Sequence, residues 1–275
     1  MSMGPGARAP RITTRELVAM KHRAEKIVCL TAYDYLFGRL VDEGGADIVL
    51  VGDSLGQVVL GYDSTIPVTL DDMIHHGRAV RRGVQHALLV VDMPFLTFQI
   101  TPEDTVRNAG RIVKETGAEA VKLEGGDEET ARHVHALVRA GIPVMGHIGL
   151  TPQSVHALGG YRVQGRGDVA AARLREEAAR LEGAGAFAVV LELVPAALAG
   201  EISRALEIPT IGIGAGAEAD GQVLVLYDML GLNEGFRPKF LRRFGELAQA
   251  TRAAVGEYAE AVRKGEYPGP EHSFE

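Results

Sequence analysis

The sequence has little of what marks several protein classes. It contains one cysteine, Cys29, so an internal disulfide and a paired-cysteine zinc site are excluded, and the composition suits a reducing cytoplasm. Its 29 Lys and Arg residues stand against 36 Asp and Glu residues, for a net charge of −7. A protein that neutralises many phosphates carries the opposite balance. Nucleic acid is therefore not expected as a partner.

A long apolar run is missing as well. The most apolar stretch, 183–200, falls short of the roughly 20 residues of a membrane-spanning helix, and Gly185 and Pro195 interrupt it. The opening residues MSMGPGARAP contain no apolar core of the signal-peptide type. No membrane partner is expected, and the protein is predicted to be cytoplasmic. We expect one domain over 12–265, with flexible tails over 1–11 and 266–275.

Eight short apolar runs recur along the chain, each followed by a polar or glycine residue and a longer amphipathic stretch. Their length and lack of alternation indicate strands that are buried on both faces. Eight such repeats in about 240 residues predict an α/β protein, a (β/α)8 barrel of the usual size, with a doubly wound open sheet as the alternative. The runs are 27–30, 48–51, 87–91, 120–123, 143–145, 188–191, 209–213 and 223–226.

Helix-start signals stand between most of these runs. Thr69, Thr101 and Thr151 each precede a candidate helix, and proline follows the last two directly, at the first helical position. Before the first run, Thr13 and Glu16 have the spacing of a capping box. An extra N-terminal helix is therefore expected to close one end of the barrel.

Polar residues gather where the runs end, which in a barrel is where the loops surround a shared cavity. Asp53 and Asp92 follow neighbouring runs, so their carboxylates would repel each other unless a cation lay between them. Oxygen ligands without cysteine favour Mg²⁺ over zinc, and Glu124 is the next candidate ligand. Lys122 would point to the same side as Glu124 and could hold a substrate carboxylate. The alternative for each residue is a helix cap, a solvated loop residue or a salt bridge. The full set is Asp34, Asp53, Asp92, Lys122, Glu124, His147, Glu192 and Asp228.

Glu192 interrupts an apolar run, and such surroundings desolvate a carboxylate and favour its use as a general base. His147 could polarise a carbonyl or be structural. The glycines of 212–216 match a dinucleotide fingerprint, but the next run begins too soon for the helix that this motif needs. They could instead receive a phosphate or allow close packing. The glycine-rich segment 159–167 is a candidate lid, or a plain connection.

Seven longer strings resemble one known family in order along the chain. They are LTAYD (30–34), VGDS (51–54), VKLEGG (121–126), GHIGLTPQS (146–154), GGYRVQGRGD (159–168), IGIGAG (211–216) and EHSF (271–274). From about residue 12 to residue 274 the chain is similar to ketopantoate hydroxymethyltransferases.

The resemblance implies a (β/α)8 barrel of the phosphoenolpyruvate/pyruvate type and a folate-dependent reaction. This is transfer of a hydroxymethyl group from 5,10-methylenetetrahydrofolate to 3-methyl-2-oxobutanoate, which gives 2-dehydropantoate on the way to pantothenate and coenzyme A. It also implies a homo-oligomer, a decamer. The implied residues are Asp53, Asp92 and Glu124 for Mg²⁺, Asp53, Ser54, Asp92 and Lys122 for the keto acid, and Glu192 as proton acceptor.

Two other functions stay open at this point. A magnesium-dependent aldolase or lyase acting on another 2-oxo acid would share the acidic residues but would not need folate. A non-catalytic metabolite-binding barrel would keep Lys122 and the metal site, yet it would tolerate Glu192→Gln, since binding needs no base.

Overall fold

The computed structural model describes residues 11–274 and divides into two compact units, Met1–Val225 and Leu226–Glu275. Most of the tail expected over 1–11 lies outside the described residues. The structure has a boundary after Val225, whereas the sequence analysis places one domain over 12–265 and a tail over 266–275. Those limits stay a prediction, and the two units are described separately.

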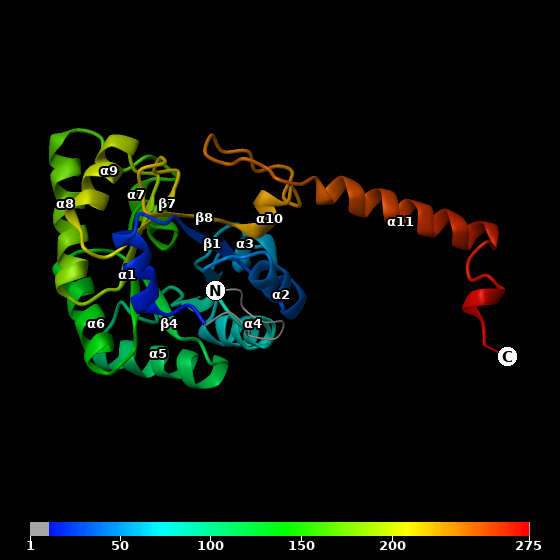
Figure 1. Ribbon diagram of the computed structural model, residues 1–275, viewed down its shortest axis with the longest axis horizontal. Helices are drawn as coiled ribbons and strands as arrows, with labels where there is room; N and C mark the ends of the chain where they lie inside the picture. The colour runs from blue at the N-terminus through cyan, green and yellow to red at the C-terminus, as the bar shows by residue number, and fades with distance from the viewer. Residues whose placement is uncertain (1–10, 275) are drawn as a thin grey trace, which may run out of the picture. The chain divides into compact units, whose positions relative to one another are not determined.

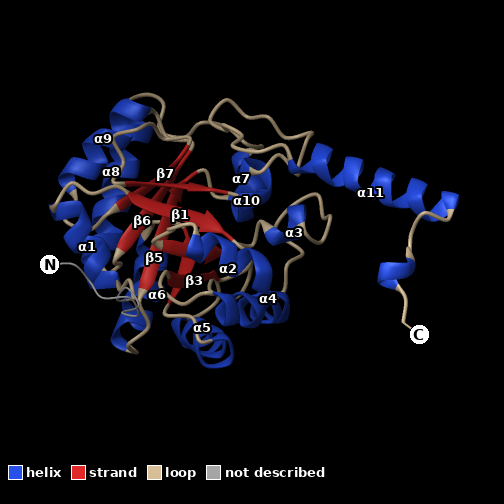
Figure 2. Ribbon diagram, turned by 45° about the vertical axis from the view of Figure 1, so that its right-hand side comes forward, coloured by secondary structure: helices blue, strands red, loops and turns tan. Residues whose placement is uncertain are grey.

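The first unit is built around a closed barrel of eight parallel strands in chain order (Figure 1 and Figure 2). β1 pairs with β2 on one side and with β8 on the other, which closes the ring. The predicted barrel is confirmed, and the open sheet is excluded. The strands are β1 (Ile27–Thr31), β2 (Ile48–Val51), β3 (Leu88–Asp92), β4 (Ala120–Glu124), β5 (Val144–Gly149), β6 (Ala188–Glu192), β7 (Thr210–Ile213) and β8 (Gly221–Leu224).

Two strands differ from their predicted limits by more than one residue. β5 continues to Gly149, so His147 lies inside the strand and not after it. β8 begins at Gly221 instead of 223. Gly221 packs against β1, where an added Cβ would stand 2.5 Å from the carbonyl oxygen of Ile27. A glycine that close packing requires carries no strand propensity, which explains why the sequence places this strand too late.

Apolar side chains fill the interior of the barrel and continue into an N-terminal helix, α1 (Thr14–His22). Leu17 and Met20 of α1 join a buried cluster that includes Ile27 and other residues near the beginnings of the strands. The expected helix at the barrel end is therefore confirmed. The hydroxyl of Thr13 accepts from the Glu16 N–H over 3.2 Å, but the Glu16 carboxylate pairs with Arg23, so half of the predicted capping box forms.

Helices follow most of the strands and cover the outside of the barrel (Figure 2). α4 begins with a complete capping box between Thr69 and Asp72, and α5 begins after Thr101 with Pro102 in its first turn. Thr151 is followed by a short 3-10 helix, η1, instead of a long helix. These elements are α2 (Tyr35–Glu43), α3 (Leu55–Val58), α4 (Leu70–Gly83), α5 (Pro102–Thr116), α6 (Glu128–Arg139), η1 (Pro152–Ser154), α7 (Val155–Leu158), α8 (Asp168–Gly183) and α9 (Ala196–Ala205).

The second unit contains α10 (Leu226–Met229), α11 (Leu247–Lys264) and a 3-10 helix, η2 (Pro270–His272). After α11 the chain folds back enough for the Tyr267 ring to lie 5.6 Å from that of Tyr258 and 5.1 Å from that of His272. Nowhere in residues 11–274 does a helix have both the length and the apolar character needed to cross a membrane.

Candidate active site

Three carboxyl side chains are buried at the carboxyl ends of β2, β3 and β4. Asp92 and Glu124 are the last residues of β3 and β4, and Asp53 lies in the turn after β2. The backbone N–H of Asp53 donates to Asp92 Oδ2 over 3.0 Å. All three side chains are at most 6% exposed. The parallel strands therefore bring together the acids that the sequence analysis selected.

Lys122 of β4 lies among these acids. Its Nζ is 2.8 Å from Asp92 Oδ1, and both side chains are shielded from solvent. Burial acts to lower the pKa of Lys122, but the carboxylates of Asp92, Asp53 and Glu124 outweigh burial and raise it. The ammonium group is therefore permanently charged, and it lies on the same side of β4 as Glu124, as predicted.

Gln153 of η1 links two of the acids. Its side-chain Nε2 donates to Asp53 Oδ2 over 2.8 Å and to the Met93 carbonyl over 2.9 Å, while its backbone N–H donates to Glu124 Oε2 over 3.0 Å. The sequence analysis gave Gln153 no role. It forms part of the family-like string GHIGLTPQS, which is the one signal that could have drawn attention to it.

The acids fit a divalent cation. Burial and the nearby Asp92 carboxylate raise the pKa of Asp53 to about 7, and burial and Asp53 raise the pKa of Glu124 well above its usual value. Glu124 Oε1 is buried and accepts no hydrogen bond from any described residue. A bound cation would reduce the repulsion between the carboxylates and would provide a partner for Glu124 Oε1.

The donor set is of the kind that Mg²⁺ prefers. Asp53, Asp92 and Glu124 offer carboxylate oxygens, which suit a hard cation. Within residues 11–274, no three His, Cys, Asp or Glu side chains form a ready-made metal centre. This is compatible with Mg²⁺, which is commonly held by one or two carboxylates together with several waters.

Glu192 ends β6 and lies beside His147 of β5. His147 Nε2 is 3.2 Å from Glu192 Oε2, and His147 Nδ1 is 3.4 Å from Lys122 Nζ. Burial and the Lys122 charge lower the pKa of His147, so the ring is neutral at neutral pH. Because an ammonium group can only donate, Nδ1 is the acceptor and Nε2 carries the proton that faces Glu192. Asp92, Lys122, His147 and Glu192 thus form one polar row across the barrel mouth.

Two further polar residues near this end of the barrel have local partners. The Ser54 hydroxyl lies 2.8 Å from the hydroxyl of Tyr33, which is fully buried. Asp34 accepts from the Phe37 N–H over 2.9 Å and caps α2, which is the structural alternative offered for it. Asp228 belongs to the second unit, where it accepts from the Asn233 side chain over 3.0 Å.

The glycine-rich segment 159–167 follows α7 and contacts the chain just after β6, and the segment 212–216 begins within β7. In 159–167, the Gln164 N–H donates to the carbonyl of Leu193, next to Glu192, over 2.8 Å. In 212–216, Gly216 has a φ of 85°, and a Cβ added there would lie 2.5 Å from Ala196 Cβ. Close packing against α9 therefore accounts for Gly216, one of the two roles left open for this segment.

Solved structures with a similar fold include several enzymes of small acids. A phosphonopyruvate hydrolase in complex with oxalate and Mg²⁺ matches with a TM-score of 0.59 at 13% identity, covering 94% of this chain and 92% of that one. A 2,3-dimethylmalate lyase of the phosphoenolpyruvate mutase/isocitrate lyase superfamily matches with a TM-score of 0.56 at 16% identity, over 94% and 92% of the two chains. These likenesses show that the chain shares its barrel fold with these proteins.

The sequence relatives are much closer. The chain is 55% identical to a 3-methyl-2-oxobutanoate hydroxymethyltransferase of Syntrophus aciditrophicus, over 99% of this chain and 100% of the relative. It is 56% identical to the protein of the same name from Moorella thermoacetica, over 98% and 99% of the two chains. The model of the ketopantoate hydroxymethyltransferase family matches residues 11–270. The chain therefore belongs to the ketopantoate hydroxymethyltransferase family.

Proposed function

We propose that this chain transfers a hydroxymethyl group from 5,10-methylenetetrahydrofolate to 3-methyl-2-oxobutanoate, giving 2-dehydropantoate for the synthesis of pantothenate. The observation that carries the proposal is the 55% identity to a 3-methyl-2-oxobutanoate hydroxymethyltransferase across 99% of the chain. The polar row at the barrel mouth supports it, because it places the positive charge of Lys122 and the carboxylate of Glu192 on either side of His147.

The keto acid binds above β2, β3 and β4 in this proposal. Lys122 has three donor protons, of which one points to Asp92 and another to His147, so the third remains for the substrate carboxylate. The Ser54 hydroxyl, held by Tyr33, supplies a second polar contact. Asp53 and Asp92 complete this side of the site.

Asp53, Asp92 and Glu124 are the residues proposed to hold Mg²⁺. When bound, the ion supplies a Lewis acid that stabilises negative charge on the keto oxygen. The protein contributes the arrangement of the acids, because Gln153 holds Asp53 and Glu124 from one short helix. Burial raises the pKa values of Asp53 and Glu124, because it destabilises their charged forms. A positive charge beside the two carboxylates would offset this destabilisation.

Glu192 is proposed to take the proton from C3 of the keto acid. His147 Nε2 has no hydrogen-bond partner among the described residues and lies 3.2 Å from Oε2 of Glu192. A small adjustment would let it donate to Oε2, which leaves Oε1 to receive the proton. The Glu192 side chain is only 16% exposed, so most of it is shielded from water. A positioned base is typically worth about 10²–10⁴ in rate. C3 of the enolate then forms a bond to the methylene carbon of the folate. Water replaces the folate nitrogen on that carbon, so the hydroxymethyl product and protonated tetrahydrofolate are released.

Proton NMR of 3-methyl-2-oxobutanoate in D₂O tests the first step directly. With enzyme and Mg²⁺ we expect the C3 proton signal to disappear, and with Glu192→Gln we expect it to persist. Glu201→Gln, at an exposed position on α9, is the matched control and should behave as the wild type. Absence of exchange with folded wild-type protein and Mg²⁺ would contradict the proposed substrate. Product formation without methylenetetrahydrofolate would favour the aldolase or lyase alternative.

We also propose that the chain assembles into a homo-oligomer, a decamer as the family resemblance implies. Sedimentation velocity at micromolar concentration measures the assembly directly. A monomer under these conditions would overturn the proposal.

A further inference from the structure

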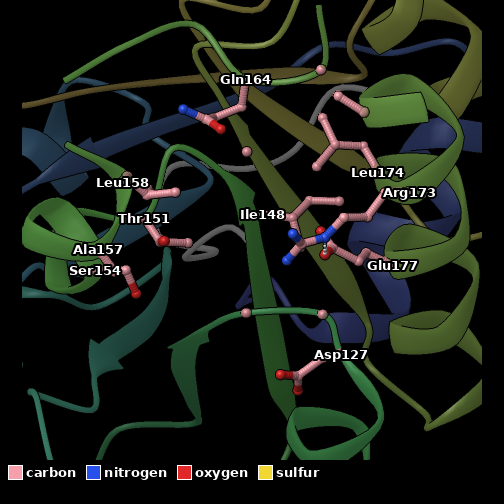
Figure 3. A pocket seen from close by; sticks show the side chains of 15 residues that line it. Asp127, Ile148, Thr151, Ser154, Ala157, Leu158, Gln164, Arg173, Leu174 and Glu177 are labelled. Carbon is pink, nitrogen blue, oxygen red and sulfur yellow. Dashed lines mark hydrogen bonds and ion pairs between the residues drawn. The ribbon is translucent and has the colours of Figure 1, made fainter. Parts of the chain in front are cut away.

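A pocket of about 440 Å³ lies beside the barrel, between the ends of β4 and β5 and the first turns of α8 (Figure 3). We call it the α8 pocket. Its volume falls within the roughly 300–1,000 Å³ that ligand sites occupy. Its lining residues include Gly125, Ile148, Thr151, Gln164, Arg173 and Leu174.

Three chain segments that line the α8 pocket continue into the candidate active site. Gly125 directly follows Glu124, and Gly149, which also lines the pocket, is paired in the barrel with Glu192. Thr151 precedes η1, whose Gln153 binds Asp53 and Glu124. A ligand in the pocket would therefore lie next to the chain segments that carry the proposed base and the proposed metal ligands.

The α8 pocket has apolar walls and uncharged polar groups at one side. Ile148 and Leu174 are buried and supply apolar surface, and a Cβ added at Gly165 would lie 2.6 Å from Leu174 Cδ1, so backbone and side chain pack closely there. Thr151 and Gln164 add an uncharged hydroxyl and amide on the side nearest to Glu192. This combination suits a flat heteroaromatic ring with amide edges.

Arg173 supplies a positive charge at the pocket. Its side chain is 76% exposed, and its Nε donates to Glu177 Oε1 over 2.6 Å. Figure 3 shows the guanidinium group directed from α8 into the pocket beside Ile148. The terminal guanidinium nitrogens remain available as donors, which is the arrangement that binds a carboxylate.

We propose that the α8 pocket binds the reduced folate that donates the one-carbon unit, with its ring near Thr151 and Gln164 and a carboxylate of its glutamyl tail on Arg173. The inference rests on the proposed function, which requires this second substrate next to the keto acid. The keto acid itself does not suit the pocket. It is far smaller than 440 Å³, and Lys122 and the buried acids proposed to hold it do not line this space.

Filling the pocket is the first test. Ala170 lines the pocket on α8, whereas Ala172 of the same helix is exposed and lies outside it. For Ala170→Phe we expect KM for 5,10-methylenetetrahydrofolate to rise about tenfold or more, the cost of one lost charged or well-packed contact. KM for the keto acid should stay within about twofold, and so should its C3 exchange without folate. Ala172→Phe should leave all three quantities unchanged.

Removing the charge is the second test, and it does not depend on how Ala170→Phe folds. Arg173→Ala should raise KM for methylenetetrahydrofolate roughly five- to tenfold. A donor whose glutamyl carboxylates are converted to amides should bind the wild type and the variant alike. Arg175→Ala is the matched control, because Arg175 lies on the same helix and pairs with Glu201 outside the pocket.

The outcomes separate the inference from the function on which it rests. Wild type that transfers the hydroxymethyl group, with Ala170→Phe and Arg173→Ala no worse than their controls toward folate, would overturn the folate site alone. The folate site alone would also be overturned if folded Ala170→Phe lost C3 exchange as strongly as it lost folate turnover. Folded wild type that neither exchanges the C3 proton nor uses folate would overturn the proposed function, and this inference with it.

Discussion

The side-chain amide of Gln153 donates to the Asp53 carboxylate over 2.8 Å, although the two residues are a hundred positions apart in sequence. The same residue donates its backbone N–H to Glu124, and its own Oε1 accepts from Gln99 Nε2 over 3.2 Å. Two of the three proposed metal ligands, Asp53 and Glu124, are thus oriented by one residue that lies after β5. Neutral donors that hold metal-binding carboxylates set their orientation before the ion arrives.

Replacing Gln153 should weaken the binding of divalent cations. Gln153→Met keeps the length and volume of the side chain but removes the Nε2 donor, so we expect Mn²⁺ affinity to fall roughly 10–100-fold. Manganese titration followed by electron paramagnetic resonance measures this without turnover. Gln99→Met is the matched control, because it removes the contact behind Gln153 and leaves the acids alone. Equal affinity in wild type and Gln153→Met would show that the contact has only a packing role.

His147 should act on the rate of proton removal and not on keto acid binding. Its Nε2 lies 3.2 Å from Glu192 Oε2, and His147→Phe would remove this donor while filling the space. We expect the C3 exchange rate to fall about tenfold or more, the value of one hydrogen bond to a charged group. Calorimetric affinity for the keto acid should change much less. A variant that loses keto acid binding and keeps its exchange rate would contradict the proposed role.

The fold and most of the acidic residues could be predicted from the sequence because their signals are local. Eight apolar runs define eight strands, and a residue at the end of a run, such as Asp92 or Glu124, lies at the carboxyl end of a strand whichever barrel forms. The same rule cannot tell a site acid from a cap. Asp34 occupies an equivalent position in sequence and caps α2.

What the sequence could not provide depends on contacts between distant segments. Gln153 gains its importance from Asp53, Met93 and Glu124, which three other strands deliver. The tautomer of His147 likewise follows from Lys122 on the neighbouring strand. No periodicity or capping signal encodes such contacts, because they exist only once the barrel is closed.

Lys122 and Asp92 should be strongly coupled in stability. Their ion pair is buried at 2.8 Å, so Lys122→Met leaves the Asp92 carboxylate among other acids without its partner. We expect a loss of about 3–5 kcal/mol in the free energy of unfolding, the usual cost of breaking a buried pair. Adding Asp92→Asn should recover part of this loss, and urea denaturation of the four proteins measures the coupling. Additive losses would mean that the pair does not act as a unit.

The stability of the first unit should also depend on pH through His133, which is remote from the candidate site. His133 of α6 is buried, its Nδ1 lies 2.7 Å from the Thr105 hydroxyl of α5, and burial lowers the pKa of His133. As the pH falls below about 6.5, the ordinary value, the unfolded chain takes up a proton that the folded chain still refuses. The contribution of His133 to folding stability is therefore fully present above the unfolded pKa. It is lost progressively as the pH falls through the lowered pKa of His133 in the folded chain.

His133→Gln removes this titration and keeps a polar side chain opposite Thr105. We expect its free energy of unfolding to fall less steeply than that of the wild type between pH 6.5 and pH 5, as measured by urea denaturation at a series of pH values. His135→Gln is the matched control, because His135 lies on the same helix and is exposed. If His133→Gln and the wild type showed the same slope, the buried ring would have no linkage to folding. A slope that is steep in both the wild type and His135→Gln but flatter in His133→Gln would assign that part of the acid sensitivity to the contact between α5 and α6.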